Sequence, residues 1–355
     1  MRARGWLVGA GALLSGLAVL ALGLELAGYS AAFALGALWS GALGSWYAVT
    51  SATLVRSVPL IIIGLGLALA FRGGAFNIGA EGQFYAGAIA ATWLGLHLGA
   101  LPSPLAVTVV LSGAALAGAL WVSVPVLLRV RYGVLEVIST LLLNFVAEAT
   151  TSLMVQGPLQ ERQGIYPQSD AIAEQARLPL LPGTRLHAGL LLALLGALLL
   201  RYLFARTRWG FQLRAVGLGP RAAEISGRID SRRMAAVALA LSGAIAGLAG
   251  GVEVAGVSYA LFQNLSPGYG FTAIAVALLG RLHPFGVVLA GLLFGALEAG
   301  AGAMQRDAGV PAVAVYVVEA VVIVVVLLAE SLRRSGTRGI ATIGAGTSQP
   351  REVAG

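Results

Sequence analysis

The sequence contains neither cysteine nor lysine among its 355 residues. Without cysteine, the chain cannot form disulfides or thiolate metal sites. Without lysine it has no Walker A phosphate loop, which ends in Gly-Lys-Ser/Thr, so it cannot be a P-loop ATPase by itself. Charged residues are also scarce, at 11% of the chain against about 25% in a typical soluble domain. These absences exclude P-loop ATPases and enzymes that depend on cysteine, and the low charge argues against a soluble protein.

Histidine is too sparse for a zinc cluster. The three residues His97, His187 and His283 lie far apart in the sequence. Zinc sites usually combine ligands at short, characteristic spacings, which this chain does not offer. We therefore expect single histidines in packed or interfacial positions and no metal site.

Apolar residues dominate the chain, at 58% of the sequence. Such a chain could not cover a water-facing surface, so the bilayer is its natural solvent. A spanning helix needs about 20 mostly apolar residues. The sequence predicts an all-α polytopic membrane protein with about ten transmembrane helices, some of them interrupted. The segments are 6–28, 52–72, 80–100, 104–128, 134–156, 187–205, 234–257, 266–280, 284–305 and 311–331.

The first and eighth of these segments have special features. Segment 6–28 resembles a signal peptide, but its apolar run is longer than a signal core, and Glu25 and Leu26 replace a small-residue cleavage site. It is expected to be a retained helix. Segment 266–280 is short and rich in glycine. Residues 29–51 carry Trp39, Trp46 and Tyr47 and are expected to form an interfacial loop.

Arginine sets the expected orientation. With ten helices and a cytoplasmic N-terminus, most of the 23 arginines fall in cytoplasmic segments, as the positive-inside rule requires. Both termini are then cytoplasmic. The minority on the outer side are Arg56, Arg162, Arg177, Arg185 and Arg306.

This orientation divides the chain into one transmembrane permease-like domain, residues 1–332, and a tail. The polar, proline-containing loop 157–186 is then external, and the basic loop 206–233 is cytoplasmic. The tail 333–355 is rich in Gly, Ser and Thr and is expected to be a disordered cytoplasmic segment.

The loop 206–233 contains a short helix signal. Pro220 suits a first helical position and Gly227 a helix end, so Arg221–Ser226 is expected to form about two turns. Such a short helix is unstable alone in water. It is either a docking helix for a cytoplasmic protein or part of an ordinary basic inner loop.

Glycines interrupt the apolar pattern in both halves of the chain. The first interruption is Phe71–Phe84, with four glycines between Gly73 and Gly82 and the polar residues Asn77, Glu81 and Gln83. The second covers Asn264–Thr272 and Arg281–Gly286. Non-helical backbone at membrane depth survives only where protein buries it or water lines it. Paired interruptions point to a translocation pathway. The alternative is a cytoplasmic loop followed by a plain helix.

A polar stripe follows one face of the segment 134–156. Glu136, Thr140 and Asn144 are four residues apart and Glu148 extends the series. A polar stripe in a membrane helix should face the bundle interior or a wet cavity. It could equally hold helices together.

Other intramembrane acids are candidates by position alone. They are Glu253, Glu298 and Glu319, and no acidic stripe links them into a proton relay. No catalytic motif is present, so the chain is not expected to be an enzyme. Glycines at 243, 247 and 251, and at 291 and 295, have the spacing of close helix packing.

The motifs together resemble a known family. The patches Phe71–Gln83, Glu136–Asn144, Leu213–Gly227 and Gly268–Gly270 are similar to permease subunits of bacterial ABC importers, of the family shared by ribose and branched-chain amino acid systems. Within that family the chain most resembles the nucleoside type, mainly through the first patch. The resemblance covers positions from about 70 to 300.

This resemblance implies partners and residue roles. A second homologous permease, a cytoplasmic ABC ATPase that uses ATP, and an extracellular solute-binding protein or lipoprotein are implied, with no cofactor on this chain. The implied location is the bacterial plasma membrane. Asn77, Glu81, Gln83, Thr140 and Asn144 are expected to shape or line a midplane cavity. The residues expected to couple to the ATPase are Arg214, Gly217, Pro220, Arg221, Ala222, Ala223, Glu224 and Gly227.

The sequence thus predicts a translocation subunit for nucleosides that works by alternating access. The alternatives are an ABC permease for a simple sugar such as ribose and, from another class, an ion-coupled secondary transporter that acts without partners.

Overall fold

The computed structural model describes residues 16, 18–225, 229–311, 317, 320 and 324. Contacts divide the chain into two compact units, one formed by Leu38–Ala303 and one by Met1–Ala37 with Met304–Gly355. The expected final segment 311–331 and the tail 333–355 lie largely or wholly outside the described residues. The first expected segment is described only from its middle onward, where residues 18–26 are helical.

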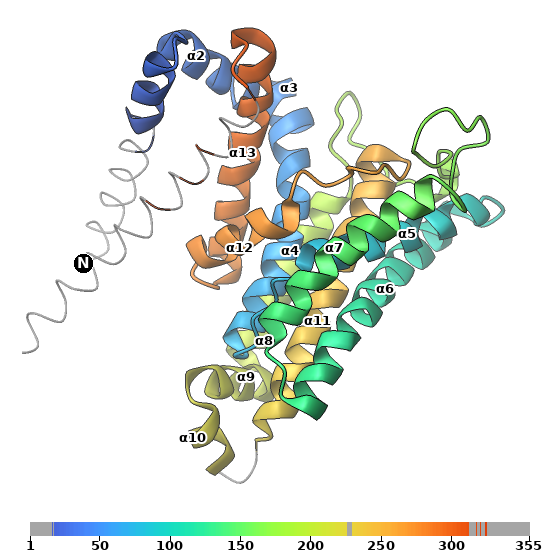
Figure 1. The fold of residues 1–355 in the computed structure, drawn as a ribbon, viewed down its shortest axis with the longest axis vertical. Coiled ribbons are helices and arrows are strands. Elements are labelled where there is room, and N and C mark those ends of the chain that lie inside the picture. Colours follow the sequence, from blue (N-terminus) through green and yellow to red (C-terminus); the bar gives the residue numbers. More distant parts are fainter. Residues whose placement is uncertain are drawn as a thin grey trace, which may run out of the picture. The chain divides into compact units, whose positions relative to one another are not determined.

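The described chain is mostly helical (Figure 1). Its α-helices are α2 Ala31–Ala42, α3 Trp46–Ala48, α4 Leu54–Arg72, α5 Ala80–His97, α6 Ser103–Tyr132, α7 Glu136–Val155, α8 Gly189–Arg206, α9 Arg208–Leu218, α10 Pro220–Ile225, α11 Ser231–Glu253, α12 Tyr269–Leu279 and α13 Pro284–Ala308. Two π-helices, η1 Val49–Thr53 and η3 Val254–Ser258, continue α3 into α4 and extend α11, and η2 Glu174–Ala176 is a 3₁₀ turn.

Six described helical stretches are long and apolar enough to cross a membrane. They are Trp46–Arg72, Ser103–Tyr132, Glu136–Val155, Gly189–Arg206, Ser231–Ser258 and Pro284–Ala308. Each overlaps a segment predicted from hydropathy. The predicted count of ten and the sides of the two termini stay predictions, because the described residues give six such stretches.

Three expectations need correction. Residues 29–51 are not a loop, because α2, α3 and the start of η1 lie there. The loop 206–233 contains a second helix, α9, whose Thr207 accepts a hydrogen bond from the Gly210 amide at 3.0 Å and so caps its N-terminus. The segment 266–280 forms only the eleven-residue α12, which at about 1.5 Å per residue cannot cross a bilayer.

The core of the larger unit is a tight crossing of α11 with α4, α5 and α6 (Figure 1). The predicted small-residue contacts are confirmed. A Cβ added at Gly247 would lie 2.8 Å from the Gly118 Cα, and one at Gly243 would lie 2.9 Å from the Gly118 carbonyl oxygen. Gly291 meets Ile61 in the same way. Helix backbones therefore touch, as in membrane bundles packed through small residues.

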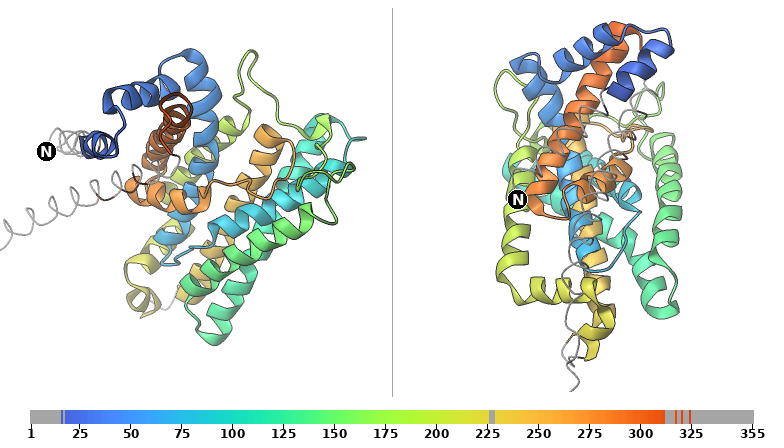
Figure 2. Two further views of the ribbon diagram at one scale, coloured as in Figure 1. Left: turned by 45° about the horizontal axis from the view of Figure 1, so that its top comes forward. Right: turned by 90° about the vertical axis from the view of Figure 1, so that its left-hand side faces the viewer.

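The two ends of this unit differ. At one end, the connection from Gln156 to Ala188 is pinned to the residues after α11: Ser169 donates its amide to Leu261, and Ile172 donates its amide to Tyr259, at 2.9 and 2.8 Å. At the other end, α9 lies across the end of α8, and α10 continues from it (Figure 2). These are called the loop end and the α10 end below.

His187 lies at the loop end as an isolated, buried residue. It is 2% exposed, and its Nδ1 accepts the Gly189 amide at 3.2 Å. Burial lowers the pKa of His187 to about 4, so the ring is neutral at physiological pH. The ring packs against Gly256, where a Cβ would lie 2.6 Å from its Cγ. This histidine fastens the loop to η3.

Candidate functional site

The interruption after α4 begins with a well-defined, hydrogen-bonded turn. The amides of Gly73 and Ala75 both donate to the Ala70 carbonyl, at 2.9 and 3.0 Å, and so close the end of α4. Gly74 has φ +72°, a conformation that favours glycine because it has no Cβ. Residues 75–79 then run without helical structure until α5 begins at Ala80. The chain thus passes through the interior as an extended segment, called the broken segment (residues 73–79).

Helix α7 supplies the hydrogen bonds that this segment lacks. Glu136 accepts the Phe76 amide at 3.1 Å and Thr140 accepts the Ile78 amide at 3.2 Å. Asn144 bonds in both directions, accepting from the Gly82 amide at 2.8 Å and donating to the Ile78 carbonyl at 2.9 Å. Glu136, Thr140 and Asn144 of the predicted stripe therefore face the interior, where they bind backbone groups. These bonds hold α7 to the broken segment and to α5 by satisfying buried polar groups, as the second of the two alternatives predicted.

Asn77 and Gln83 lock the two sides of the turn into α5. The Asn77 amide nitrogen donates to Gln83 at 2.7 Å and to Ser242 of α11 at 3.0 Å. The Gln83 amide nitrogen donates back to Asn77 at 2.9 Å, and the Gly79 amide donates to the same Asn77 oxygen at 3.0 Å. Both side chains are at most 1% exposed. A buried network with every member satisfied fixes one backbone conformation.

Glu81 joins the broken segment to the second interruption. Its carboxylate accepts the Gly270 amide at 2.6 Å, in the first turn of α12. A negative charge is favourable at a helix N-terminus because the first amides have no helical partner. Gly268, just before α12, has φ +97°, which again favours glycine. The two glycine-rich patches, far apart in sequence, therefore meet at one carboxylate.

These five side chains, expected to shape or line a pathway, are all buried. Asn77, Glu81, Gln83, Thr140 and Asn144 are at most 2% exposed, and each bonds to backbone or to another member. They line neither the cavity described in the next paragraph nor an apolar cavity between α5, α6 and α7. Their direct effect is to hold the broken segment and α12 in place, and a role in the pathway stays a proposal.

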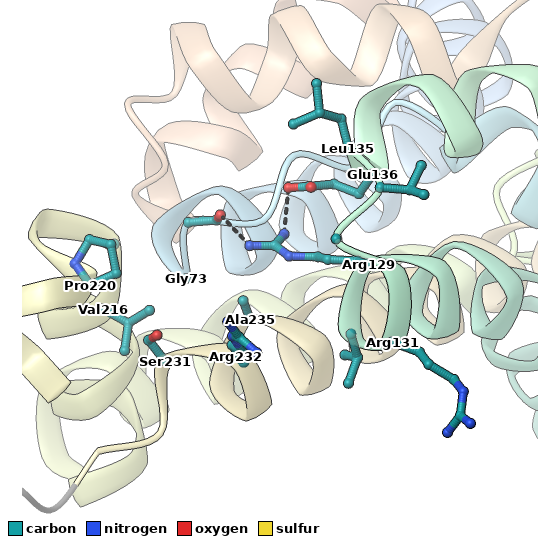
Figure 3. A pocket seen from close by; sticks show the side chains of 15 residues that line it. Gly73, Arg129, Arg131, Leu135, Glu136, Val216, Pro220, Ser231, Arg232 and Ala235 are labelled. Carbon is teal, nitrogen blue, oxygen red and sulfur yellow. Dashed lines mark hydrogen bonds and ion pairs between the residues drawn. The ribbon is translucent and has the colours of Figure 1, made fainter.

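A cavity of about 600 Å³ lies beside the network, at the α10 end. Arg129 reaches across it to form an ion pair with Glu136 and lies 3.4 Å from the Gly74 carbonyl oxygen, whereas Arg131 points away (Figure 3). Glu136 therefore has two partners, an arginine and the Phe76 amide. The lining residues come from the broken segment, the α6–α7 turn, and α9 to α11. They include Gly73, Gly133, Val216, Pro220, Ser231 and Ala235.

The expected coupling residues occupy α9, α10 and the turn between them. Arg214, Gly217, Pro220, Arg221, Ala222 and Glu224 are exposed, whereas Ala223 is buried. Glu224 accepts a hydrogen bond from the Ser231 hydroxyl, which ties α10 to the start of α11. The helix starts at Pro220, as predicted, but the predicted end at Gly227 lies outside the described residues.

Helix α9, which the sequence reading missed, connects α10 to the network. A Cβ at Gly217 would collide with the Arg72 carbonyl oxygen and lie 3.4 Å from the Gly74 amide. A Cβ at Gly73 would lie 2.6 Å from Leu213. The end of α9 thus packs directly on the turn that begins the broken segment. Thr207, a residue type that often caps a helix N-terminus, was the sequence signal for this helix.

Asn144→Leu is expected to destabilise the protein strongly. Leucine has a similar volume, but it leaves the Gly82 amide and the Ile78 carbonyl without their partner, and each such buried group costs about 1–3 kcal/mol. We expect a large fall in the thermal midpoint of the purified protein in detergent. The same substitution at the exposed Asn264 is the control. Equal midpoints for the two variants would contradict this role for Asn144.

Two acids noted in the sequence lie outside this network. Glu298 lies 3.7 Å from Arg56, and Glu253 is 6% exposed at the junction of α11 and η3. Both belong to the loop-end half of their helices. Glu319 lies outside the described residues.

Comparison with known proteins identifies the family of this chain. Residues 49–327 match the family described as branched-chain amino acid transport system / permease component. The guanosine ABC transporter permease protein NupP of Bacillus subtilis is 38% identical over 91% of this chain and 93% of its own length. The glucose ABC transporter permease protein of Haloferax volcanii is 37% identical over 91% of this chain and 87% of its own. A second Bacillus subtilis guanosine permease protein, NupQ, is 28% identical over 70% and 79%.

The family match covers the broken segment, α7, α9, α10 and α12, so every part of the site described above lies within it. With the described spans of apolar helix, it makes the protein a membrane protein. The chain therefore belongs to the family of permease components of branched-chain amino acid transport systems, and is an ABC transporter permease.

Proposed function

We propose that this chain is one half of the membrane channel of an ATP-driven importer for nucleosides in a bacterial plasma membrane. Both termini and the α10 end face the cytoplasm, and the loop end faces outward. The second half is a homologous permease chain. Two guanosine permease proteins of one organism resemble this chain to different degrees, which supports pairing between different chains.

One geometric observation carries the coupling part of this proposal. The last residue of α9 and the last residue of the short α10 present exposed apolar side chains, with Leu218 92% and Ile225 86% exposed. A six-residue helix needs a partner for stability. Arg214 and Arg221 keep this end basic. An ATPase that covers α10 would bury the two apolar residues. Its conformational change would then displace α10 relative to the rest of the chain.

The contacts described above connect α10, through α9, to the broken segment and α12. Movement of α10 is transmitted to α9, whose Gly217 rests on the turn at Gly74. The broken segment is fastened to α7 by three side chains, and Glu81 fastens the start of α5 to α12. In this proposal the five buried network residues shape the pathway by moving these segments as one body. Hydrolysis of ATP belongs to the partner, and this chain carries translocation alone.

Reconstitution tests the function. The chain, a second permease, an ATPase and a solute-binding protein encoded with it are placed in liposomes, and uptake of labelled guanosine is measured with and without ATP. We expect uptake that requires ATP and the binding protein. Guanosine uptake by the purified chain alone, without ATP, would contradict the proposal and favour an ion-coupled transporter.

A simple sugar is the second candidate solute. It is favoured by the 37% identity with the glucose permease protein of Haloferax volcanii. In the same liposomes, excess ribose or glucose competes with guanosine only if the complex transports sugars. We expect no competition, because the relatives of the nucleoside type include two further permease proteins from Lactococcus lactis.

A further inference from the structure

Glu148 has an unusual position in α7. It is the thirteenth of twenty residues in this apolar helix, so it lies about 18 Å from one end and about 10 Å from the other. The hydrocarbon core of a bilayer is about 30 Å thick, which places Glu148 well inside it. Its side chain is nevertheless exposed. Within the described part of the chain, no hydrogen bond or ion pair reaches its carboxylate.

The neighbours of Glu148 include several polar groups beside the exposed, apolar Phe145. Ser152 lies one turn further along the same side of α7, and its hydroxyl accepts the Gln263 side-chain amide at 3.2 Å. The Tyr85 hydroxyl accepts the Ser266 amide at 3.2 Å. Glu148 also interacts electrostatically with Tyr85 and with Glu81. We call this group, Tyr85, Glu148, Ser152, Gln263 and Ser266, the Glu148 patch.

The rest of the exposed surface of α7 is quite different. Leu142, Val146 and Leu153 are 59%, 48% and 64% exposed and carry no polar atoms in their side chains. These residues suit lipid. Val146 lies two residues before Glu148, on the opposite side of the helix. Helix α7 thus has three flanks: one that binds the broken segment, one that suits lipid, and one that carries a carboxylate.

A carboxylate at this depth faces water or protein, because lipid cannot solvate it. The broken segment cannot be its partner, since that segment is already bonded to Glu136, Thr140 and Asn144. On the Glu148 side of α7, Ser152 instead accepts its hydrogen bond from Gln263 of the connection 259–268. This connection leads to α12 (Figure 1). The connection overlaps the start of the second glycine-rich interruption, Asn264–Thr272. A polar surface beside irregular backbone is the expected wall of an aqueous pathway.

We propose that Glu148 lines the solute pathway and accepts hydrogen bonds from the transported nucleoside, an inference that rests on the function proposed above. An ionised carboxylate only accepts hydrogen bonds, and nucleosides carry suitable donors in their ribose hydroxyls and base N–H groups. Charge-assisted hydrogen bonds of this kind are stronger than neutral ones. Gln263, Ser152 and Tyr85 add neutral groups that can hydrogen bond around the same solute.

Chemical labelling tests the aqueous exposure of Glu148. The chain has no cysteine, so Glu148→Cys and Val146→Cys each introduce a single reactive site. The thiolate reacts, and it forms in water but not in lipid. In the assembled importer, we expect a charged, membrane-impermeant thiosulfonate to modify the Glu148→Cys chain, guanosine to slow this reaction, and the Val146→Cys chain to stay unmodified.

Three results of the labelling would overturn the inference. They are an unreactive Glu148→Cys chain, equal labelling of both variants, and labelling that guanosine does not slow. A carboxylate that instead contacts the second permease gives the first of these results. If Glu148→Cys does not assemble, Ser152→Cys takes its place, since Ser152 lies on the same flank.

Transport measurements separate this inference from the proposed function. Glu148→Gln keeps the shape and removes the charge, and we expect at least tenfold slower guanosine uptake while assembly and ATP hydrolysis persist. If the unaltered complex does not transport guanosine, the proposed function fails. If it does and Glu148→Gln transports equally well, or fails to bind its partners, only the role of Glu148 fails.

Discussion

Gly247→Leu is expected to prevent the chain from assembling in the membrane. Gly247 lies where α11 crosses α6 and α5. An added Cβ would already lie 2.8 Å from the Gly118 Cα and would collide with the Ala114 carbonyl oxygen. On the other side, a Cβ at Gly87 would meet the Gly247 backbone. A leucine has no flexible neighbour to displace, so whole helices must separate, and the small-residue contacts that replace a hydrophobic driving force in lipid are lost.

The measurement is the yield of monodisperse protein after detergent extraction, followed by its thermal midpoint. A matched pair of alanine variants isolates the packing effect. Gly196 of α8 has only a side-chain atom of Leu65 near its added Cβ, at 3.6 Å, which is ordinary contact. Gly196→Ala should raise the midpoint slightly, because alanine favours helix by up to about 1 kcal/mol. Gly247→Ala should lower the midpoint. Equal midpoints for the two alanine variants would contradict the close packing of α11 at Gly247.

Much of this crossing was foreseeable. The glycine spacing at 243, 247 and 251 predicted close contact, and the helices themselves follow from long apolar runs. The partner of these glycines was not foreseeable. Gly118 belongs to α6, whose sequence between Ser103 and Tyr132 does not indicate which helix it crosses. Apolar helices in lipid show little amphipathic pattern, so hydropathy identifies them without pairing them.

For the polar network too, one part could be predicted from the sequence and another part could not. The spacing of Glu136, Thr140 and Asn144 predicted a shared face because it is local geometry. Their partners lie 60 or more residues away, in the broken segment, and the bond from Gly270 to Glu81 spans 189 residues. No local pattern reports such pairs. For Glu148, local spacing was misleading. The spacing placed it on the same face as Asn144, but it lies at the edge of that face, where it is exposed.

The errors in secondary structure came from short helices. Ala31–Ala42 has aromatic and glycine residues that are also typical of interfacial loops. Arg208–Leu218 lies in a basic loop, where charge suggested irregular structure, although its N-terminal cap was readable. Such helices of eleven or twelve residues are marginal alone and depend on packing that the sequence does not display.

If α10 docks an ATPase as proposed, Ile225→Asp is expected to uncouple the permease from that ATPase. Ile225 is 86% exposed at the end of α10, and burial of an isoleucine side chain in an interface stabilises a complex by about 1.5–3 kcal/mol. Aspartate removes this term and adds the cost of burying a charge. Because 1.4 kcal/mol corresponds to tenfold in affinity, binding of the ATPase should weaken by about a hundredfold. ATP-dependent guanosine uptake should fall with it.

The control uses the same substitution at the other end of the molecule. Ile165, in the connection from α7 to α8, is 66% exposed. Ile165→Asp adds the same charge to the same chain, at a comparable surface position that the ATPase does not reach in the proposed orientation. The readout is retention of the ATPase by the affinity-tagged permease complex in detergent. If Ile225→Asp retained the ATPase while Ile165→Asp lost it, the orientation would be reversed. If both variants lost the ATPase, or if both retained it, α10 would not be the docking element.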